Sequence, residues 1–288
     1  MKVRWDWHIH SHHSPCGNRE CTLDRILRGT REAGLEHAGV TDHLNCRRNE
    51  PAVLACRQEF DALPDKSGFH FAVELTCIRR WDLEENERLG EKGSIYGFQS
   101  GGPADGELTV HLPDEVRERV RPEYVIAGAH STLGAPVERQ ALIRQQHRQH
   151  MFLATHPLVD ILAHPFWWNG PGHDEKGDYA GLPWFDDMGV IPRSMHNELA
   201  AASRENGVAI EINPGGIFMN PHYSDAFKHQ YWEFLALMKE AGVKFSFASD
   251  SHSAGYEGRL SRIQEGLDGL RLRKSDVWLP RKKGGKKL

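Results

Sequence analysis

The sequence lacks any long apolar run. Within its 288 residues, no apolar stretch approaches the roughly 18 residues that a membrane span needs. The opening Met1-Lys2-Val3-Arg4 leads into a predicted strand and does not have the pattern of a signal peptide. These absences predict a cytoplasmic protein with no membrane partner.

Cysteine is also scarce, and the chain has no excess of basic over acidic residues. The cysteines are odd in number and confined to the first third of the chain, which indicates reduced thiols rather than a disulfide framework. They are Cys16, Cys21, Cys46, Cys56 and Cys77. The net charge of -4 argues against a general nucleic-acid binder, because such binding depends on many phosphate contacts. Only residues 281–288 form a basic run, and we expect this tail to be mobile and solvated.

Histidine, in contrast, is abundant, with 18 residues. His8 and His10 follow a short apolar run, and Asp250 and His252 follow another near the far end of the chain. Because residues two apart on a strand point to the same face, each pair places two metal-competent side chains at one strand end. The two pairs can meet only if the chain closes into a ring.

Short β-like runs alternate with helical patterns along the chain. The predicted strands cover residues 3–10, 37–41, 69–75, 124–129, 159–163, 208–212 and 243–248. The predicted helices cover residues 22–34, 51–63, 139–154, 193–205 and 225–242. This alternation predicts a parallel sheet. Because the candidate ligands span the chain, we expect one domain over residues 1–270, followed by a C-terminal segment over residues 271–288.

Polar residues at the strand ends favour a barrel over an open sheet. Nearly every predicted strand ends in a carboxylate or a histidine. An open sheet concentrates its site at one crevice, whereas a barrel collects side chains from all its strand ends on one face. We therefore predict an irregular seven-stranded (β/α) barrel, similar to a TIM barrel, with a metal site at the C-terminal ends of the strands.

Two stretches interrupt the alternation, residues 77–111 and 166–192. The first is rich in glycine and charged residues, and the second in tryptophan and glycine. Both follow strand ends, where the loops of a barrel build the active-site face. We predict that these long loop insertions form walls or lids over a substrate. The alternative is that they are surface insertions without a role in binding.

The strand-end residues form an ordered set of short motifs. In chain order these are His8-x-His10, Thr41-Asp42-His43, Glu74, Gly128-Ala129-His130, Ala163-His164-Pro165, Glu211-x-Asn213 and Ser249-Asp250-Ser251-His252. This order resembles the PHP family, named for polymerase and histidinol phosphatase, and the resemblance spans residues 5–252. The resemblance implies a metal-dependent phosphoesterase on an irregular barrel.

The resemblance also implies a trinuclear metal cluster. Its expected ligands are His8, His10, Glu74 and Asp250 for the first ion, Glu74, His130 and His164 for the second, and His43 and His252 for the third. Imidazole and carboxylate suit zinc, manganese or iron, so we expect two to three divalent ions of this kind. Ions bridged by a carboxylate can share a water and make it a hydroxide nucleophile. The expected catalytic residues are Glu74, Asp250 and His252.

One element departs from that pattern. The family commonly supplies a His or Asp to the third ion within a Ser-x-His or Ser-x-Asp element, whereas this chain has Ser14-Pro15-Cys16, preceded by His12 and His13. Cys16 could bind as a thiolate, which would favour zinc or iron. His12 or His13 could replace it, or the third site could be weak or empty. The spacing does not rank these alternatives.

Further residues have predicted supporting roles. We expect Glu211 to orient a ligand histidine or the nucleophilic water, and Asn213 to cap a neighbouring loop. Asp42 is expected to support His43. The candidate phosphate contacts are arginines near strand ends, with solvated surface roles as the alternative: Arg47, Arg48, Arg79 and Arg80. The candidate leaving-group acids are the loop histidines His173, His196 and His222.

The predicted function is hydrolysis of a phosphoester by a metal-activated hydroxide, with a small phosphomonoester as substrate. One alternative is a nuclease that acts on nucleic-acid ends or short oligonucleotides. Another is an amidohydrolase-like enzyme that acts on a carbon centre, because related metal barrels use the same activated water. A binding module with a degraded cluster is disfavoured, since all of the expected ligands are of a competent type.

Overall fold

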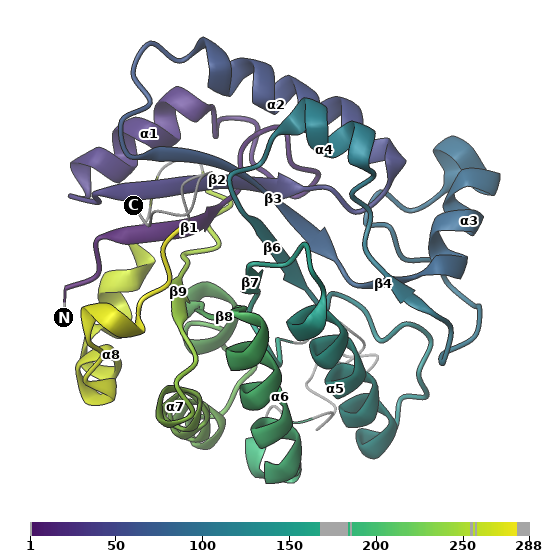
Figure 1. The fold of residues 1–288 in the computed structure, drawn as a ribbon, viewed down its shortest axis with the longest axis vertical. Coiled ribbons are helices and arrows are strands. Elements are labelled where there is room, and N and C mark those ends of the chain that lie inside the picture. Colours follow the sequence, from purple (N-terminus) through teal and green to yellow (C-terminus); the bar gives the residue numbers. More distant parts are fainter. Residues whose placement is uncertain (1, 168–183, 185, 254–255, 257, 281–288) are drawn as a thin grey trace.

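The fold is built on a central parallel sheet (Figure 1). The structure is a computed structural model that describes residues 2–167, 184, 186–253, 256 and 258–280. Its main sheet has seven strands in the spatial order β1-β2-β3-β6-β7-β8-β9. They are β1 (Trp5–Ile9), β2 (His37–His43), β3 (Phe69–Thr76), β6 (Val125–Gly128), β7 (Ile161–Leu162), β8 (Ala209–Ile212) and β9 (Phe245–Phe247). Each overlaps one predicted strand, so the predicted strand order is confirmed.

The sheet is nearly closed into a barrel. After β9 the chain continues to Ser251, which forms a parallel bridge with Ile9 at the end of β1. The backbone N–H of His10 donates to the carbonyl oxygen of Ser251 at 3.0 Å, and that of Asp250 donates to the carbonyl oxygen of His8 at 2.9 Å. The predicted irregular barrel is therefore confirmed, and the two predicted residue pairs lie side by side at its seam.

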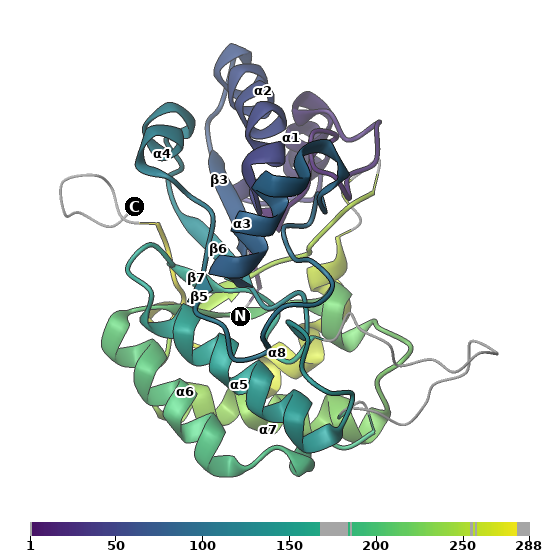
Figure 2. The same ribbon diagram turned by 90° about the vertical axis from the view of Figure 1, so that its right-hand side faces the viewer.

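Helices cover the outside of the barrel. They are α1 (Leu23–Glu32), α2 (Glu50–Ala62), α3 (Arg80–Leu89), α4 (Asp114–Val120), α5 (Arg139–Thr155), α6 (Arg193–Asn206), α7 (Asp225–Glu240) and α8 (Gln264–Leu270). In both views α1, α2 and α4 lie along one side of the sheet, and α5, α6 and α7 along the other (Figures 1 and 2). Within the described ranges, no helix combines the length and the hydropathy needed to cross a bilayer.

Helix α7 shows how the sequence sets these elements. The Ser224 hydroxyl accepts the backbone N–H of Phe227 at 3.0 Å and so caps the first turn. Gly242 follows the last turn with a φ of 82°, a left-handed conformation that glycine adopts without strain. The buried side chains recur at helical spacing and face the barrel: Phe227, Tyr231, Phe234, Leu235 and Met238.

Aromatic side chains fill the end of the barrel where β6 begins. The Tyr124 hydroxyl donates to the backbone carbonyl of Trp7 at 2.7 Å, and the Trp7 ring packs edge-on against Tyr124 and Trp278. Gly39 in β2 makes this packing possible, because a Cβ there would lie 1.7 Å from the Tyr124 hydroxyl oxygen. The polar strand-end residues lie at the opposite, C-terminal end of the strands.

Residues 77–111 differ from the loop that we predicted. They contain an antiparallel pair, β4 (Ile78–Arg79) and β5 (Leu108–Thr109), together with α3. The prediction was wrong because it weighed the glycines, which begin only after α3, above the helix-favouring run before them. In that run, the Asp82 carboxylate accepts the backbone N–H of Arg79 at 2.8 Å and supports the helix start. Much of the second insertion (168–183 and 185) and the basic tail (281–288) lie outside the described residues.

Candidate metal centre

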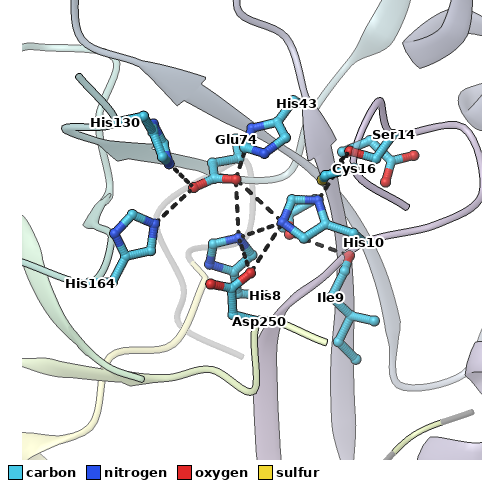
Figure 3. Close-up of polar contacts among 12 residues, drawn as sticks. His8, Ile9, His10, Ser14, Cys16, His43, Glu74, His130, His164 and Asp250 are labelled. Carbon is cyan, nitrogen blue, oxygen red and sulfur yellow. Dashed lines mark hydrogen bonds and ion pairs between the residues drawn. The ribbon is translucent and has the colours of Figure 1, made fainter. Parts of the chain in front are cut away.

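The Glu74 side chain lies at the centre of the site (Figure 3). It projects from β3, is 1% exposed, and presents each carboxylate oxygen to a different group of imidazoles. From Oε1 the distances are 3.1 Å to His130 Nε2 and 3.3 Å to His164 Nε2. From Oε2 they are 3.0 Å to His43 Nδ1, 3.2 Å to His8 Nε2 and 3.4 Å to His10 Nε2. One buried carboxylate thus lies between two sets of imidazole nitrogens.

Asp250 and His252 approach the same group from the end of β9. The Asp250 Oδ1 atom lies 3.3 Å from His10 Nε2 and 3.7 Å from His8 Nε2. His252 Nδ1 lies 2.8 Å from the backbone carbonyl oxygen of Asp250, and its ring stacks on that of His10 with centroids 4.3 Å apart. Asp250 has a φ of 52°, and such backbone conformations concentrate at functional sites. The structure therefore brings all of the predicted ligands together.

Cys16 also belongs to this group. Its Sγ atom, one nitrogen of His10 and one of His43 all lie within 4.8 Å of one another. Burial of the thiol opposes its ionisation, but the imidazoles of His10, His252 and His43 outweigh burial and lower the pKa of Cys16 to about 2. A thiolate at this position has the charge and the softness of a zinc or iron ligand.

His12 and His13 point elsewhere. The Nε2 atom of His13 lies 2.7 Å from a carboxylate oxygen of Glu59 on α2, and that of His12 lies 3.4 Å from the same oxygen. Of the three candidates that the sequence left open beside the third site, only Cys16 lies with the other predicted ligands.

Glu211 on β8 contacts two of the histidines that are predicted ligands. Its Oε1 atom lies 2.7 Å from His8 Nδ1, and its Oε2 atom accepts the backbone N–H of His164 at 2.7 Å. The Asn213 amide donates to Glu211 Oε2 and to Asp250 Oδ2, both at 3.1 Å, while its Oδ1 accepts a loop N–H as the predicted cap. By holding His8 Nδ1, Glu211 leaves Nε2 facing Glu74 as the atom that would bind a metal ion.

Two other side chains make polar contacts near the cluster, and only the second, Asp42, had a predicted role. The Thr76 hydroxyl lies 3.0 Å from His130 Nδ1 and so leaves the His130 Nε2 atom directed at the centre. Asp42 was predicted to support His43, but its carboxylate instead accepts the Ser11 backbone N–H at 2.6 Å and the Ser11 hydroxyl at 2.5 Å. The expectation for Asp42 is therefore wrong, because alternation along β2 directs its side chain away from His43.

Burial and charge oppose each other within the cluster. Burial raises the pKa of Glu74 and of Asp250, but the surrounding imidazoles outweigh it and hold both well below their ordinary values. Burial lowers the pKa of His8, yet Glu74, Glu211 and Asp250 raise it well above its usual value. In His130, burial prevails over Glu74 and the pKa is lowered.

The donor set fits divalent metal ions. Glu74 Oε2 and His43 Nδ1 are buried, and neither has a hydrogen-bond partner within the described part of the chain, although they lie 3.0 Å apart. Imidazole nitrogens that converge on a shared carboxylate are the ligands of zinc, iron and manganese sites, and the carboxylate can bridge two ions.

A cavity of about 220 Å³ opens over the cluster. Beside the cluster residues, it is lined by Asn45, Thr76, Tyr96, Phe98 and Trp167. Tyr96 and Phe98 come from the first insertion and Trp167 from the second, so both predicted insertions contribute walls. The sequence reasoning missed Asn45 and Thr76, although each lies two residues after a predicted ligand, on the same face of the chain.

The four candidate arginines do not line this cavity. Arg79 is fully buried, and its guanidinium donates to both carboxylate oxygens of Asp82 and to three backbone carbonyls. Arg80 is exposed, and Arg47 and Arg48 line a separate cavity. The phosphate contact suggested for these arginines is therefore not supported by the described residues.

The candidate leaving-group acids are not placed at the cluster either. His196 on α6 packs against Phe166 and Phe234, and burial lowers its pKa to about 4. His222 is exposed and does not line the cavity. His173 lies outside the described residues.

Comparison with solved structures agrees with this architecture. No family model and no curated protein matches the chain. Among solved structures, it is similar to the histidinol phosphate phosphatase of Lactococcus lactis subsp. lactis, crystallised with zinc, L-histidinol and phosphate. The two share 16% identity, with a TM-score of 0.56 over 94% of this chain and 95% of that one. The fold is a PHP-like, distorted TIM barrel.

A protein of Agrobacterium tumefaciens, solved in an apo form, aligns at 12% identity with a TM-score of 0.44, over 96% of this chain and 91% of that one. The PHP-like barrel of the present chain carries its buried His- and Glu-rich cluster at the C-terminal ends of the strands, as the sequence resemblance predicted.

Proposed function

We propose that this protein is a metal-dependent hydrolase that cleaves small phosphomonoesters. The observation that carries the proposal is the placement of Glu74, whose two carboxylate oxygens face separate groups of imidazoles at 3.0 to 3.4 Å. A carboxylate in this position bridges neighbouring ions in two-metal hydrolases.

Each ion has a distinct set of proposed ligands. They are His8, His10, Glu74 and Asp250 for the first ion, Glu74, His130 and His164 for the second, and His43, His252 and Cys16 for the third. When bound, two to three zinc, manganese or iron ions would lower the pKa of a shared water toward neutrality and offset charge on the phosphoryl oxygens. The proposed catalytic residues are Glu74, Asp250 and His252.

The remaining side chains position this machinery and the substrate. Glu211 and Thr76 hold their histidines in the tautomer that directs Nε2 inward, and Asn213 holds Asp250. Tyr96 and Phe98 present stacked rings toward a substrate's organic group, with ring centroids 6.2 Å apart.

The lining of the cavity bears on the substrate. No lysine or arginine lines it among the described residues, so the charge of a phosphate there would be balanced by the ions. A cavity of about 220 Å³ suits a small substrate better than a nucleic-acid strand. The zinc and phosphate bound in the similar phosphatase structure also support a small phosphorylated substrate. The cysteines are free thiols, which fits a cytoplasmic protein.

The decisive experiment compares ester classes with metal-depleted and reconstituted protein. We expect zinc, manganese or iron to restore hydrolysis of an aryl phosphomonoester and to leave amides and lactones untouched. Faster cleavage of an aryl phosphodiester or of short oligonucleotides would favour a nuclease. Hydrolysis of a lactone or an amide, with no phosphatase activity under any metal, would overturn the proposal.

A further inference from the structure

A second group of metal-competent side chains lies outside the cluster. It consists of His12 and His13, in the loop after β1, and Glu59 on α2. One ligand atom from each residue lies within 4.8 Å of the other two, and the two imidazole rings have centroids 4.0 Å apart and planes tilted by 37°. All three side chains are partly exposed, at 26%, 19% and 30%, so an ion can reach them from solvent.

The ligand atoms are held by neighbours. His12 Nδ1 lies 3.2 Å from the backbone carbonyl oxygen of Cys21, which accepts its proton and leaves Nε2 with a lone pair. Glu59 Oε1 accepts the backbone N–H of Leu23 at 2.9 Å, which leaves Oε2 directed at both imidazoles. A simple ion pair needs only one imidazole and one carboxylate. Here two imidazoles contact the same Glu59 oxygen, Oε2, whose direction is fixed by the hydrogen bond to Oε1.

We propose that His12, His13 and Glu59 form a zinc-type metal site that is separate from the catalytic cluster. With metal–ligand bonds of roughly 2.0 to 2.1 Å, neighbouring ligand atoms of a tetrahedral zinc lie about 3.3 Å apart. The distance from His12 Nε2 to Glu59 Oε2 is already 3.4 Å, and the His13 contact of 2.7 Å has to open only slightly.

The ligand types select the ion. Two imidazoles and one carboxylate suit zinc and its transition-metal neighbours, whereas magnesium and calcium require more oxygen ligands than this single carboxylate provides. Three protein ligands on a solvent-facing surface leave the fourth position to water.

The location assigns the site a structural role. His12 and His13 stand between the cluster ligand His10 and Cys16 in the chain, and Glu59 lies on α2. An ion at this site would cross-link the loop to α2. It would thereby hold the segment that presents Cys16 to the cluster.

The test counts metal ions on protein whose cluster is loaded. The loaded protein is titrated with Zn²⁺, with bound metal measured by equilibrium dialysis and elemental analysis, and with Co²⁺, whose absorption reports tetrahedral geometry. We expect one additional ion on the wild type. Glu59→Gln keeps the oxygen that accepts from Leu23 but removes the charged ligand, so it should weaken this ion at least roughly tenfold.

Two further variants sharpen the test. His13→Ala should weaken the same ion to a similar extent, which keeps the proposal testable if Glu59→Gln folds poorly by circular dichroism. His147→Ala is the matched control, because His147 pairs with Glu198 at 2.9 Å in a surface contact that has no third metal-competent partner among the described residues. It should leave the additional ion unchanged.

The proposal stands apart from the phosphatase function. Asp250→Asn should disturb the cluster while the additional ion remains, even if the protein has no phosphatase activity. A wild type that takes up no ion beyond those of the cluster would overturn the proposal. The same holds if Glu59→Gln and His13→Ala bind the additional ion with unchanged affinity, or if both lose the cluster ions together with it.

Discussion

The backbone N–H of Asp250 donates a hydrogen bond of 2.9 Å to the carbonyl oxygen of His8. Their side chains lie on the same side of this seam, with Asp250 Oδ1 3.7 Å from His8 Nε2. Barrel closure and assembly of the proposed first metal site are therefore the same event. A chain that fails to close this seam cannot bring the two residues to one ion.

Replacing Asp250 with Asn should remove activity and spare the fold. Asn tolerates the φ of 52° found here and keeps the backbone bond to His8, but it loses the ligand charge. We expect turnover to fall by roughly 100-fold or more, with an unfolding free energy close to that of the wild type. Asp114→Asn, on the exposed surface of α4, is the control. Full activity in the Asp250 variant would contradict the ligand role.

Cys16 should react with alkylating agents in a distinctive way once metal is removed. Burial opposes ionisation, but His10 and its neighbours lower the pKa of Cys16 to about 2, so the thiolate persists throughout the range from pH 5 to pH 7. Its alkylation rate should stay flat there, whereas the rate of an ordinary thiol of pKa about 8.5 falls about tenfold per pH unit. Burial raises the pKa of the other cysteines, which should stay unreactive.

Adding zinc back should protect Cys16 from the reagent, as mass spectrometry of the labelled protein would show. Cys16→Ser should abolish the labelling, and Cys46→Ser should leave it intact. If labelling proceeds at the same rate with and without zinc, Cys16 is not a ligand.

Glu211→Gln should lower metal affinity without removing a ligand. Glu211 holds His8 Nδ1 and the backbone of His164. Hydrogen bonds that orient a metal-binding residue are typically worth 10- to 100-fold in metal affinity. Competition with a chelator measures the change. An affinity equal to that of the wild type would mean that His8 keeps its tautomer without Glu211.

Arg79 should matter for stability. Its guanidinium is fully buried and pairs with Asp82, so Arg79→Ala leaves an uncompensated buried charge and should lower the free energy of unfolding by about 3 to 5 kcal/mol. Arg80→Ala removes an exposed pair with Glu107, which solvent screens, and should cost far less than Arg79→Ala. Denaturant unfolding measures both. Equal losses of unfolding free energy in the two variants would contradict a structural role for the buried Arg79–Asp82 pair.

His150 should make stability depend on pH. Burial lowers the pKa of His150 to about 3 in the folded protein, below its unfolded value of about 6.5. The unfolded chain therefore takes up a proton first as pH falls. The contribution of neutral His150 is fully present above pH 6.5 and is lost, at about 1.4 kcal/mol per pH unit, as pH falls toward 3.

His150→Gln should remove this dependence. Urea unfolding in the presence of a chelator, from pH 6 to pH 4, should show the wild type losing stability relative to the variant. His229→Gln changes an exposed histidine on α7, and its unfolding free energy should depend on pH as that of the wild type does. Parallel curves for His150→Gln and the wild type would show that His150 is protonated equally in both states.

Much of the fold could be predicted from local patterns. Short apolar runs that alternate with helical periodicity located the seven strands. A buried parallel strand is apolar along its length, whereas a helix that buries one face has apolar residues three or four apart. Helix α3 was missed because the glycines after it dominated the interpretation, and its start depends on Asp82. The candidate ligands were found because each closes a strand, and Asn45 could have been found from its position two residues after His43, whereas Tyr96 carries no signal until the cavity is formed.

The sequence by itself determined the barrel, the candidate ligands at the strand ends and the unusual element at Cys16. Only the tertiary structure decided which of Cys16, His12 and His13 faces the cluster, since three residues of one short loop can turn in different directions without changing any local pattern. It also placed Arg79 in a buried ion pair with Asp82. The physical reason is that side-chain direction in a loop depends on partners distant in the chain, here Glu59 for the two histidines and His43 for the thiol.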